Sequence, residues 1–284
     1  MTKLSLVTLP AEIIWLIGGQ LKTEKDISAL MRANTVLYRL LLRNLYKRNI
    51  DQSGSSALVW CSMKGSEESV RLLVSMRANV DCAYRFPGQS EWDSAAPLHV
   101  AANERIAKIL LDHGANINIV SYRGDTALHR AAVNRHLALA SFLLDRGINI
   151  NVSGHIDRSS YCICHTALHL AVQNQDYRMA RLFIEWGADL EIKNGFWERP
   201  LHLAVSKNCE SITKLLIDYG ADLNAQDFFQ QTPLHGAVAS GNVSLARVLV
   251  VHGSCLALKD NKGQTASDIA TQNGNGEMLD ILNL

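Results

Sequence analysis

The stretch "RPLHLAVSKNCESITKLLIDYGADLNAQDFFQQTPLHGAV", residues 199–238, decides the fold, because the phrase that opens it returns near its end. Its two histidines, His202 and His235, are 33 residues apart. The same phrase occurs as "APLHVAA", "TALHRAA" and "TALHLAV", and degenerate copies read "SALVWC" and "TASDIA". A phrase that repeats with a period near 33 residues predicts a stack of short, similar units.

Each unit has the signals of two short helices. A threonine, such as Thr232, stands where its hydroxyl caps the first helix, and Pro233 follows at a position that needs no N–H. The second helix has apolar residues at helical spacing, as in Ile212, Leu215 and Leu216. It ends at a glycine, which suits a left-handed C-terminal position. One such unit cannot bury its own apolar face, so we expect the units to stack.

These motifs resemble the ankyrin repeat family over residues 55–284, as about seven units with degenerate first and last copies. The resemblance implies an all-α solenoid of helix pairs with protruding finger loops. It also implies protein partners along the fingers and the concave helical face. The repeated histidines resemble a metal or catalytic array, but equivalent positions in a stack are about 10 Å apart, too far to share an ion. The resemblance instead implies that each histidine hydrogen-bonds the threonine cap and the neighbouring turn.

Three irregularities interrupt the repeat. Insertions fall near 84–96 and 152–165, and the unit of His99 is three residues short, which predicts a tight turn around residues 103–105. Insertions in repeat proteins map to loops. The second insertion offers four weak metal-ligand candidates, but their spacing is not one that zinc sites usually have, and a polar loop is the simpler reading. These candidates are His155, Cys162, Cys164 and His165.

Two neighbouring fingertips carry large aromatic residues. Regular fingers read "SYRGDT" or "DNKGQT". In two neighbouring fingers between these, Trp197 and Gln230 occupy the position of the glycine. A side chain at a position that prefers positive φ costs about 1 kcal/mol or more, so either the turn changes shape or strain is retained. The aromatic residues either pack between fingers or form an exposed patch for a partner. We predict that Phe196, Trp197, Phe228 and Phe229 form one patch that faces a partner, and Tyr122 on an earlier finger is a further partner-binding candidate.

Residues 1–50 do not fit the repeat. The segments "LPAEIIWLIGGQL" and "DISALMRANTVLYRLL" predict short amphipathic helices, and their order resembles an F-box fused to ankyrin repeats, with Tyr46 near the place of the usual late tryptophan. The resemblance implies docking to a Skp-type adaptor of a cullin–RING ubiquitin ligase, with the repeats holding the substrate. The alternative is a helical cap that seals the first repeat. The expected adaptor-binding residues are Leu9, Pro10, Ile13, Ile17, Leu30 and Tyr38.

Composition narrows the function further. The chain has 284 residues, of which 28 are basic and 27 acidic. This balance does not provide the large positive charge that binding to nucleic acid or to an anionic membrane requires. Six cysteines without a framework of spacings predict reduced thiols in the cytoplasm or nucleus. No phosphate loop, nucleophile elbow or dinucleotide fingerprint occurs, so we expect no cofactor and no enzyme. A scaffold or inhibitor, and an enzyme that uses the solenoid groove, remain the alternatives to a ligase subunit.

Overall fold

The computed structural model describes Arg43, Tyr46, Lys47 and residues 49–51, 55–85, 94–154 and 164–283. The predicted adaptor-binding residues, from Leu9 to Tyr38, lie outside this part of the chain. The chain divides into two compact units, one ending at Tyr122 and the other beginning at Arg123. The predicted domain boundary near residue 50 stays a prediction.

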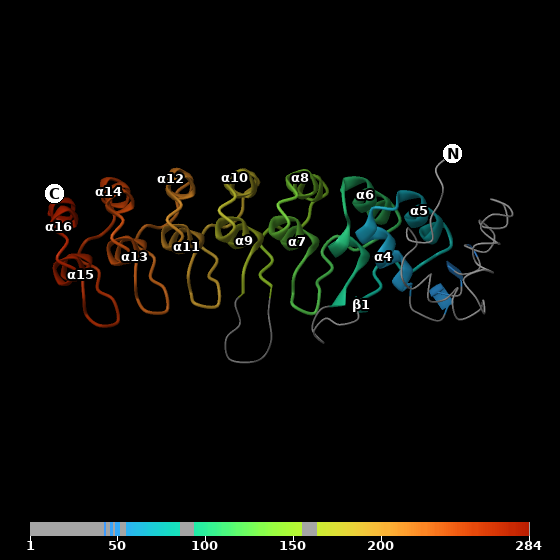
Figure 1. Ribbon diagram of the computed structural model, residues 1–284, viewed down its shortest axis with the longest axis horizontal. Helices are drawn as coiled ribbons and strands as arrows, with labels where there is room; N and C mark the ends of the chain where they lie inside the picture. The colour runs from blue at the N-terminus through green and yellow to red at the C-terminus, as the bar shows by residue number, and fades with distance from the viewer. Residues whose placement is uncertain are drawn as a thin grey trace, which may run out of the picture. The chain divides into compact units, whose positions relative to one another are not determined.

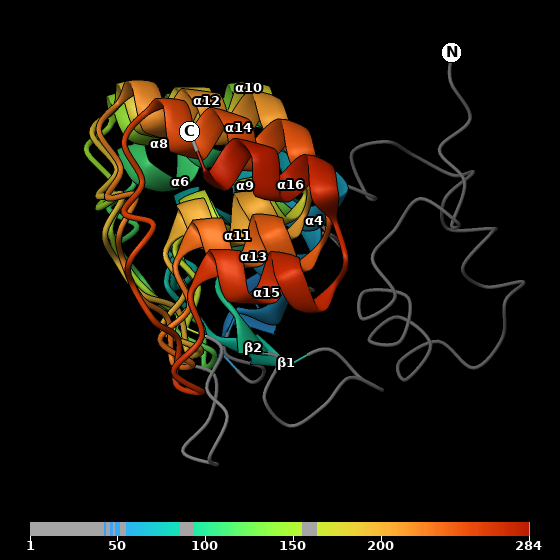
Figure 2. The ribbon, with the colours of Figure 1, turned by 90° about the vertical axis from the view of Figure 1, so that its left-hand side faces the viewer.

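The second compact unit is a stack of five helix pairs (Figure 1). The first helices of the pairs lie in one row and the second helices in another, and the finger loops all project from the same side (Figures 1 and 2). Each first helix has seven residues: α7 (Ala127–Val133), α9 (Ala167–Gln173), α11 (Pro200–Ser206), α13 (Pro233–Ala239) and α15 (Ala266–Gln272). The second helices are α8 (Leu137–Asp145), α10 (Tyr177–Glu185), α12 (Glu210–Asp218), α14 (Val243–Val251) and α16 (Gly276–Leu282).

The first compact unit contributes two more pairs, α4 (Ser56–Lys64) with α5 (Glu67–Ser75) and η2 (Pro97–Val100) with α6 (Glu104–Asp112). The described residues therefore form seven helix pairs, as the period predicts. They also include two short antiparallel strands that an all-α reading does not anticipate, β1 (Tyr84–Arg85) and β2 (Ser94–Ala95). These strands form the two ends of the first insertion.

The short unit loses its residues from the first helix and not from the turn, so the predicted tight turn was wrong. Its first helix is a four-residue 3₁₀ turn, η2, where the other units have seven-residue α-helices. Three residues separate η2 from α6, as many as separate α11 from α12, so the turn itself is not shortened. The Asn103 side chain caps α6 by accepting a hydrogen bond from the backbone N–H of Ile106 at 3.1 Å.

The core lies between neighbouring pairs. Alanines of the first helices, such as Ala204 and Ala237, are fully buried and let the helices approach closely. Leucines of both helices fill the remaining space, as Leu234, Leu245 and Leu249 of α13 and α14 do within the core of the last three pairs. This packing explains why a single unit is not stable alone.

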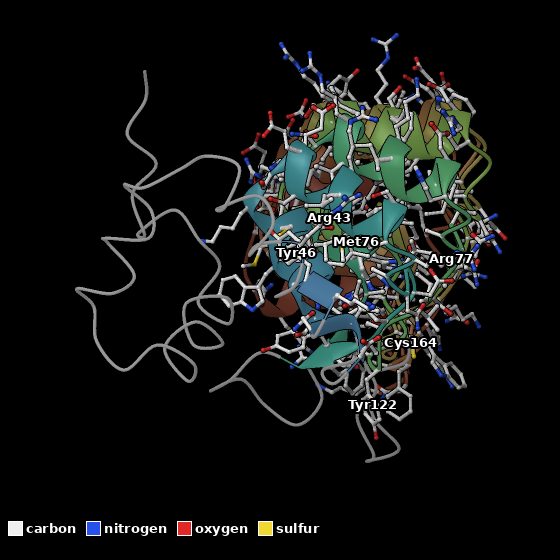
Figure 3. All side chains as sticks on the ribbon, turned by 90° about the vertical axis from the view of Figure 1, so that its right-hand side faces the viewer. Arg43, Tyr46, Met76, Arg77, Tyr122 and Cys164 are labelled. Carbon is white, nitrogen blue, oxygen red and sulfur yellow. The ribbon has the colours of Figure 1, made fainter. Side chains whose placement is uncertain are left out.

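Two residues that precede α4, Tyr46 and Asn49, dock onto this helix. Tyr46 is buried, and its hydroxyl lies 3.8 Å from Sγ of Cys61 in α4 (Figure 3). The Asn49 side chain accepts a hydrogen bond from the backbone N–H of Ala57 at 3.0 Å and donates one to Oγ of Ser56 at 2.9 Å. Asn49 thus satisfies an N–H at the start of α4 that the helix itself leaves unpaired. Within the described ranges, no helix is long and apolar enough to cross a membrane.

Candidate protein-binding surface

The last three fingertips each owe their shape to one asparagine or aspartate, namely Asn194, Asp227 or Asp260. In the finger between α10 and α11, Oδ1 of Asn194 accepts hydrogen bonds from the backbone N–H groups of Phe196 at 2.9 Å and Glu198 at 3.0 Å. In the next finger, Oδ1 of Asp227 accepts from Phe229 and Gln231, both at 2.8 Å. These bonds close the turn by the side-chain mechanism that makes Asx residues common in loops.

The strain expected at the glycine position is retained. Trp197 has a φ of 60° and Gln230 a φ of 57°. The equivalent residues of regular fingers are Gly124 and Gly263, with φ values of 73° and 77°. All four turns therefore keep a left-handed residue at this position, and two of them place a side chain where L-residues cost about 1–2 kcal/mol.

The aromatic side chains of these two fingers are exposed. Phe196, Trp197, Phe228 and Phe229 expose 43%, 53%, 59% and 50% of their surface. We call these four residues the fingertip patch. The Trp197 ring meets Phe228 edge to face at 5.9 Å between centroids, and Phe228 meets Phe229 in the same way at 5.4 Å. Packing between the fingers thus covers only part of each ring, and the rest faces solvent.

Neighbouring fingers are joined by backbone hydrogen bonds. The N–H of Phe228 donates to the carbonyl of Phe196 at 3.1 Å, and the N–H of Asn261 donates to the carbonyl of Phe229 at 2.9 Å. The Gln226 side chain adds a bridge, because its Nε2 donates to the carbonyls of Gln230 at 2.8 Å and Lys259 at 3.0 Å. Three successive fingertips are therefore held in fixed register.

Two charged contacts at this site have no signal in the repeat pattern. The Lys193 ammonium lies 5.0 Å from the centroid of the Trp197 ring, within the range of a cation–π contact. Arg199 replaces the usual capping threonine, and its Nε lies 2.7 Å from Oε2 of Glu191. Both contacts depend on side-chain conformations that the spacing of residues does not determine.

The repeated histidines have a structural role. In the unit of His169, the Thr166 hydroxyl lies 2.8 Å from Nδ1, and Nε2 donates to the carbonyl of Glu198 in the next finger at 3.2 Å. Because Nε2 faces a carbonyl and Nδ1 faces donors, the ring is neutral. Burial lowers the pKa of His169 to about 4, and burial also lowers the pKa of His129 and His202. Each histidine thus links its own helix cap to the next finger.

The remaining predicted site residues lie elsewhere. Tyr122 is exposed on a finger loop of the first compact unit (Figure 3). His155 and Cys162 lie outside the described residues, whereas Cys164 is half-buried and the His165 ring is 5.7 Å from that of His169. Over the described parts of the chain, no group of three or more histidine, cysteine or acidic side chains is arranged to hold a metal ion.

Comparison with solved structures shows the same architecture. The chain resembles the crystal structure of the ankyrin repeat domain of Bcl-3, a member of the IκB protein family, with a TM-score of 0.67 and 27% identity. The match covers 80% of this chain and 97% of the Bcl-3 chain.

Among curated proteins, the human Ankyrin repeat and SOCS box protein 16 is 28% identical over 207 residues, which are 69% of this chain and 42% of that protein. The putative ankyrin repeat protein FPV014 of Fowlpox virus is 32% identical over 99 residues, 33% of this chain and 21% of that protein. The matches thus span less than half the length of these relatives.

Family models agree with the helix pairs. A model described as ankyrin repeats (3 copies) matches residues 84–154, 159–227 and 201–283, and one described as ankyrin repeats (many copies) matches residues 128–184. The matched segments cover more than half of the chain and include six of the seven helix pairs. The chain therefore belongs to the ankyrin repeat family and is a protein–protein interaction module.

Proposed function

We propose that the protein recognises a client protein through the fingertip patch. The observation that supports this most directly is that four large aromatic side chains, each about half exposed, stand on two fingers joined through their backbones. Aromatic residues dominate the binding energy of protein interfaces, and exposed clusters of them mark interaction sites. The fixed register reduces the ordering that binding would otherwise require.

Affinity purification with quantitative mass spectrometry tests this proposal. The test variant carries Phe196→Ser, Phe228→Ser and Phe229→Ser, none of which changes a left-handed position. The control variant carries Tyr177→Ser and Tyr219→Ser, because these aromatic residues are also exposed but lie away from the fingertips, at the start of α10 and just after the end of α12. We expect clients to be recovered with the wild type and the control but lost with the test variant. Equal recovery of clients with all three proteins would show that the fingertip patch does not bind them.

We further propose that the chain is the substrate-recognition subunit of a cullin–RING ubiquitin ligase. Its N-terminal segment, from Leu9 to Tyr38, would dock a Skp-type adaptor, and the repeats would hold the client near the ubiquitin-charged enzyme. The contribution of the chain is effective concentration and not a chemical step. The support is the F-box-like order of the N-terminal residues, and the human relative likewise joins ankyrin repeats to a second module, a SOCS box.

A pull-down with a purified Skp-type adaptor tests the ligase proposal. The variant Leu9→Ala/Pro10→Ala/Ile13→Ala is expected to lose the adaptor while keeping the clients of the fingertip patch. The triple serine variant of the patch is the matched control and is expected to keep the adaptor. If wild type and the N-terminal variant recover equal adaptor, the ligase proposal fails while recognition by the fingers stands.

The second candidate function is a scaffold or inhibitor whose N-terminal helices only cap the repeats. Burial of Tyr46 and the two hydrogen bonds of Asn49 favour a capping role for these two residues. A cap and an adaptor-binding segment are compatible, since the predicted adaptor-binding residues precede these positions. Recovery of clients without adaptor from the wild-type protein would select the scaffold.

We propose the cytoplasm or nucleus as the place of action. Three cysteines in the described part of the chain are free thiols, as expected where the environment is reducing: Cys82, Cys209 and Cys255. Burial raises the pKa of Cys82 to about 12, which keeps this thiol protonated and unreactive. Imaging of a tagged full-length chain tests the compartment.

A further inference from the structure

We propose that the fingertip patch binds a short, extended and acidic segment of the client. This inference rests on the proposed function, since it names the chemistry of what the patch recognises. It follows from the distribution of charge over the three joined fingers, between α10 and α11, α12 and α13, and α14 and α15.

Three lysines of these fingers project into solvent, whereas Arg199 is paired with Glu191. Lys193, Lys259 and Lys262 are all exposed. Lys193 lies over the Trp197 ring at 5.0 Å, on the first finger. Lys262 follows Asn261, whose N–H is bonded to the carbonyl of Phe229 on the second finger. Lysines of the first and third fingers therefore flank the aromatic residues.

The acidic residues of the same tips are engaged within the turns. Oε2 of Glu198 accepts a hydrogen bond from Nδ2 of Asn194 at 2.8 Å. Oδ1 of Asp227 accepts two backbone N–H groups, and so does Oδ1 of Asp260, from Lys262 and Gln264, each at 2.9 Å. Asp260 is buried. These carboxylates support the turn backbone, so the outward surface presents aromatic rings with a cationic rim, which complements an acidic partner.

The arrangement of the rings favours a peptide over a nucleic acid. Bases bind to such platforms by stacking on flat aromatic faces. Here Trp197 and Phe228 meet at 84°, and Phe228 and Phe229 at 86°, so each ring covers part of the face or edge of its neighbour. Such an edge-to-face cluster presents an uneven apolar surface that suits aliphatic and aromatic side chains.

The size of the partner segment follows from the repeat spacing. Neighbouring repeats are about 10 Å apart, so three fingertips span about 20 Å. An extended chain advances about 3.3 Å per residue, so about six residues reach across the surface. The expected ligand is therefore a segment of this length with apolar residues over the rings and Asp or Glu near the lysines.

Selection from a random 12-residue peptide library displayed on phage, with the full chain as bait, tests the inference. Selected peptides are then titrated by fluorescence anisotropy against the variant Lys193→Gln/Lys259→Gln/Lys262→Gln. The charge-matched control is Arg178→Gln/Lys207→Gln/Arg247→Gln, whose residues are exposed but lie off the fingertips. A third protein, the triple serine variant of the patch, reports whether a peptide uses the aromatic residues. A labelled 15-nucleotide oligo(dT) is titrated in parallel.

We expect the selected peptides to be enriched in Asp and Glu and to lose binding to the serine variant. We expect the lysine variant to weaken them about ten-fold, the control to change them less than two-fold, and added salt to weaken them as well. Peptides that need the aromatic residues but are neutral or basic, or that ignore the lysines, would overturn this inference alone. Tighter binding of oligo(dT), dependent on the same lysines, would also overturn it. Absence of any peptide that needs the aromatic residues would count against the proposed function itself.

Discussion

Replacement of Gln230 by glycine should make the protein more stable. The backbone of Gln230 has a φ of 57° in a turn where regular fingers have glycine. Its side chain is exposed, and its N–H and carbonyl keep their bonds to Asp227 and Gln226 whatever the side chain is. The substitution therefore isolates the strain of the left-handed position.

The magnitude follows from two opposing effects. Relief of a left-handed residue is worth about 1–2 kcal/mol. Glycine offsets about 0.5–1 kcal/mol of this gain, because an unfolded chain with glycine has more conformational entropy to lose on folding. We expect Gln230→Gly to raise the free energy of unfolding by about 0.5–1 kcal/mol, because the centres of these two ranges differ by about 0.75 kcal/mol.

Trp197→Gly relieves the same strain at a φ of 60° but removes contacts. The ring packs edge to face on Phe228 and lies under the Lys193 ammonium, and each contact is worth about 0.5–1 kcal/mol. We expect no gain in stability, or a loss of about 1 kcal/mol. The difference between the two glycine variants thus measures what Trp197 contributes to the fold.

Urea unfolding followed by circular dichroism measures these changes. The reverse substitution, Gly263→Gln, is the control, because a Cβ at Gly263 meets no atom within 4 Å and its φ is 77°. It should lower the free energy of unfolding by about 1 kcal/mol. If Gln230→Gly is neutral or destabilising while Gly263→Gln is harmless, the turns are not strained and the reasoning is wrong.

Three further predictions concern the scaffold. The contribution of His169 to stability should be constant above pH 6.5 and should be lost as the pH drops toward 4, because its pKa is about 4 in the folded protein against an ordinary 6.5. Urea midpoints across this range should show a loss of about 3 kcal/mol from this residue. Thr232→Ala should lower the free energy of unfolding by about 1–2 kcal/mol, since the Thr232 side chain is buried and its hydroxyl lies 2.8 Å from Nδ1 of His235. Urea unfolding of this variant, compared with Thr271→Ala at an exposed threonine, measures the loss. Tyr46→Ala should destabilise the first repeat by about 3 kcal/mol and increase hydrogen exchange in α4, whereas the exposed Lys47→Ala should not.

The repeat made the helix pairs predictable from sequence. The spacing of His169, His202 and His235 indicates the register, and the threonine, proline and glycine positions indicate where helices begin and end. The first two pairs were harder to predict, because the missing residues of one unit shorten its first helix and the insertion adds two strands. Deletions and insertions change local backbone geometry in ways that the average repeat does not contain.

The candidate site was predictable in part. The register assigns Phe196, Trp197, Phe228 and Phe229 to two fingertips, but it leaves open whether they pack inward or face solvent. That depends on whether the turn keeps a left-handed residue at Trp197, which is a balance of about 1 kcal/mol against the Asx bonds. The cation–π contact of Lys193 follows from one side-chain rotamer. The role of this site in binding stays a prediction.

The hydrogen bonds that join the fingertips have a consequence for how specificity can change. The bonds from Phe228 to Phe196 and from Asn261 to Phe229 use only main-chain atoms, and the turns are closed by Asn194 and Asp227. The exposed rings add only edge-to-face contacts to this main-chain frame. Recognition residues can therefore be exchanged over many generations, or in the laboratory, with little change in the frame that displays them. Aromatic residues at positions 261 and 262 would extend the same surface to a third finger, which makes this protein a starting point for binders of altered preference.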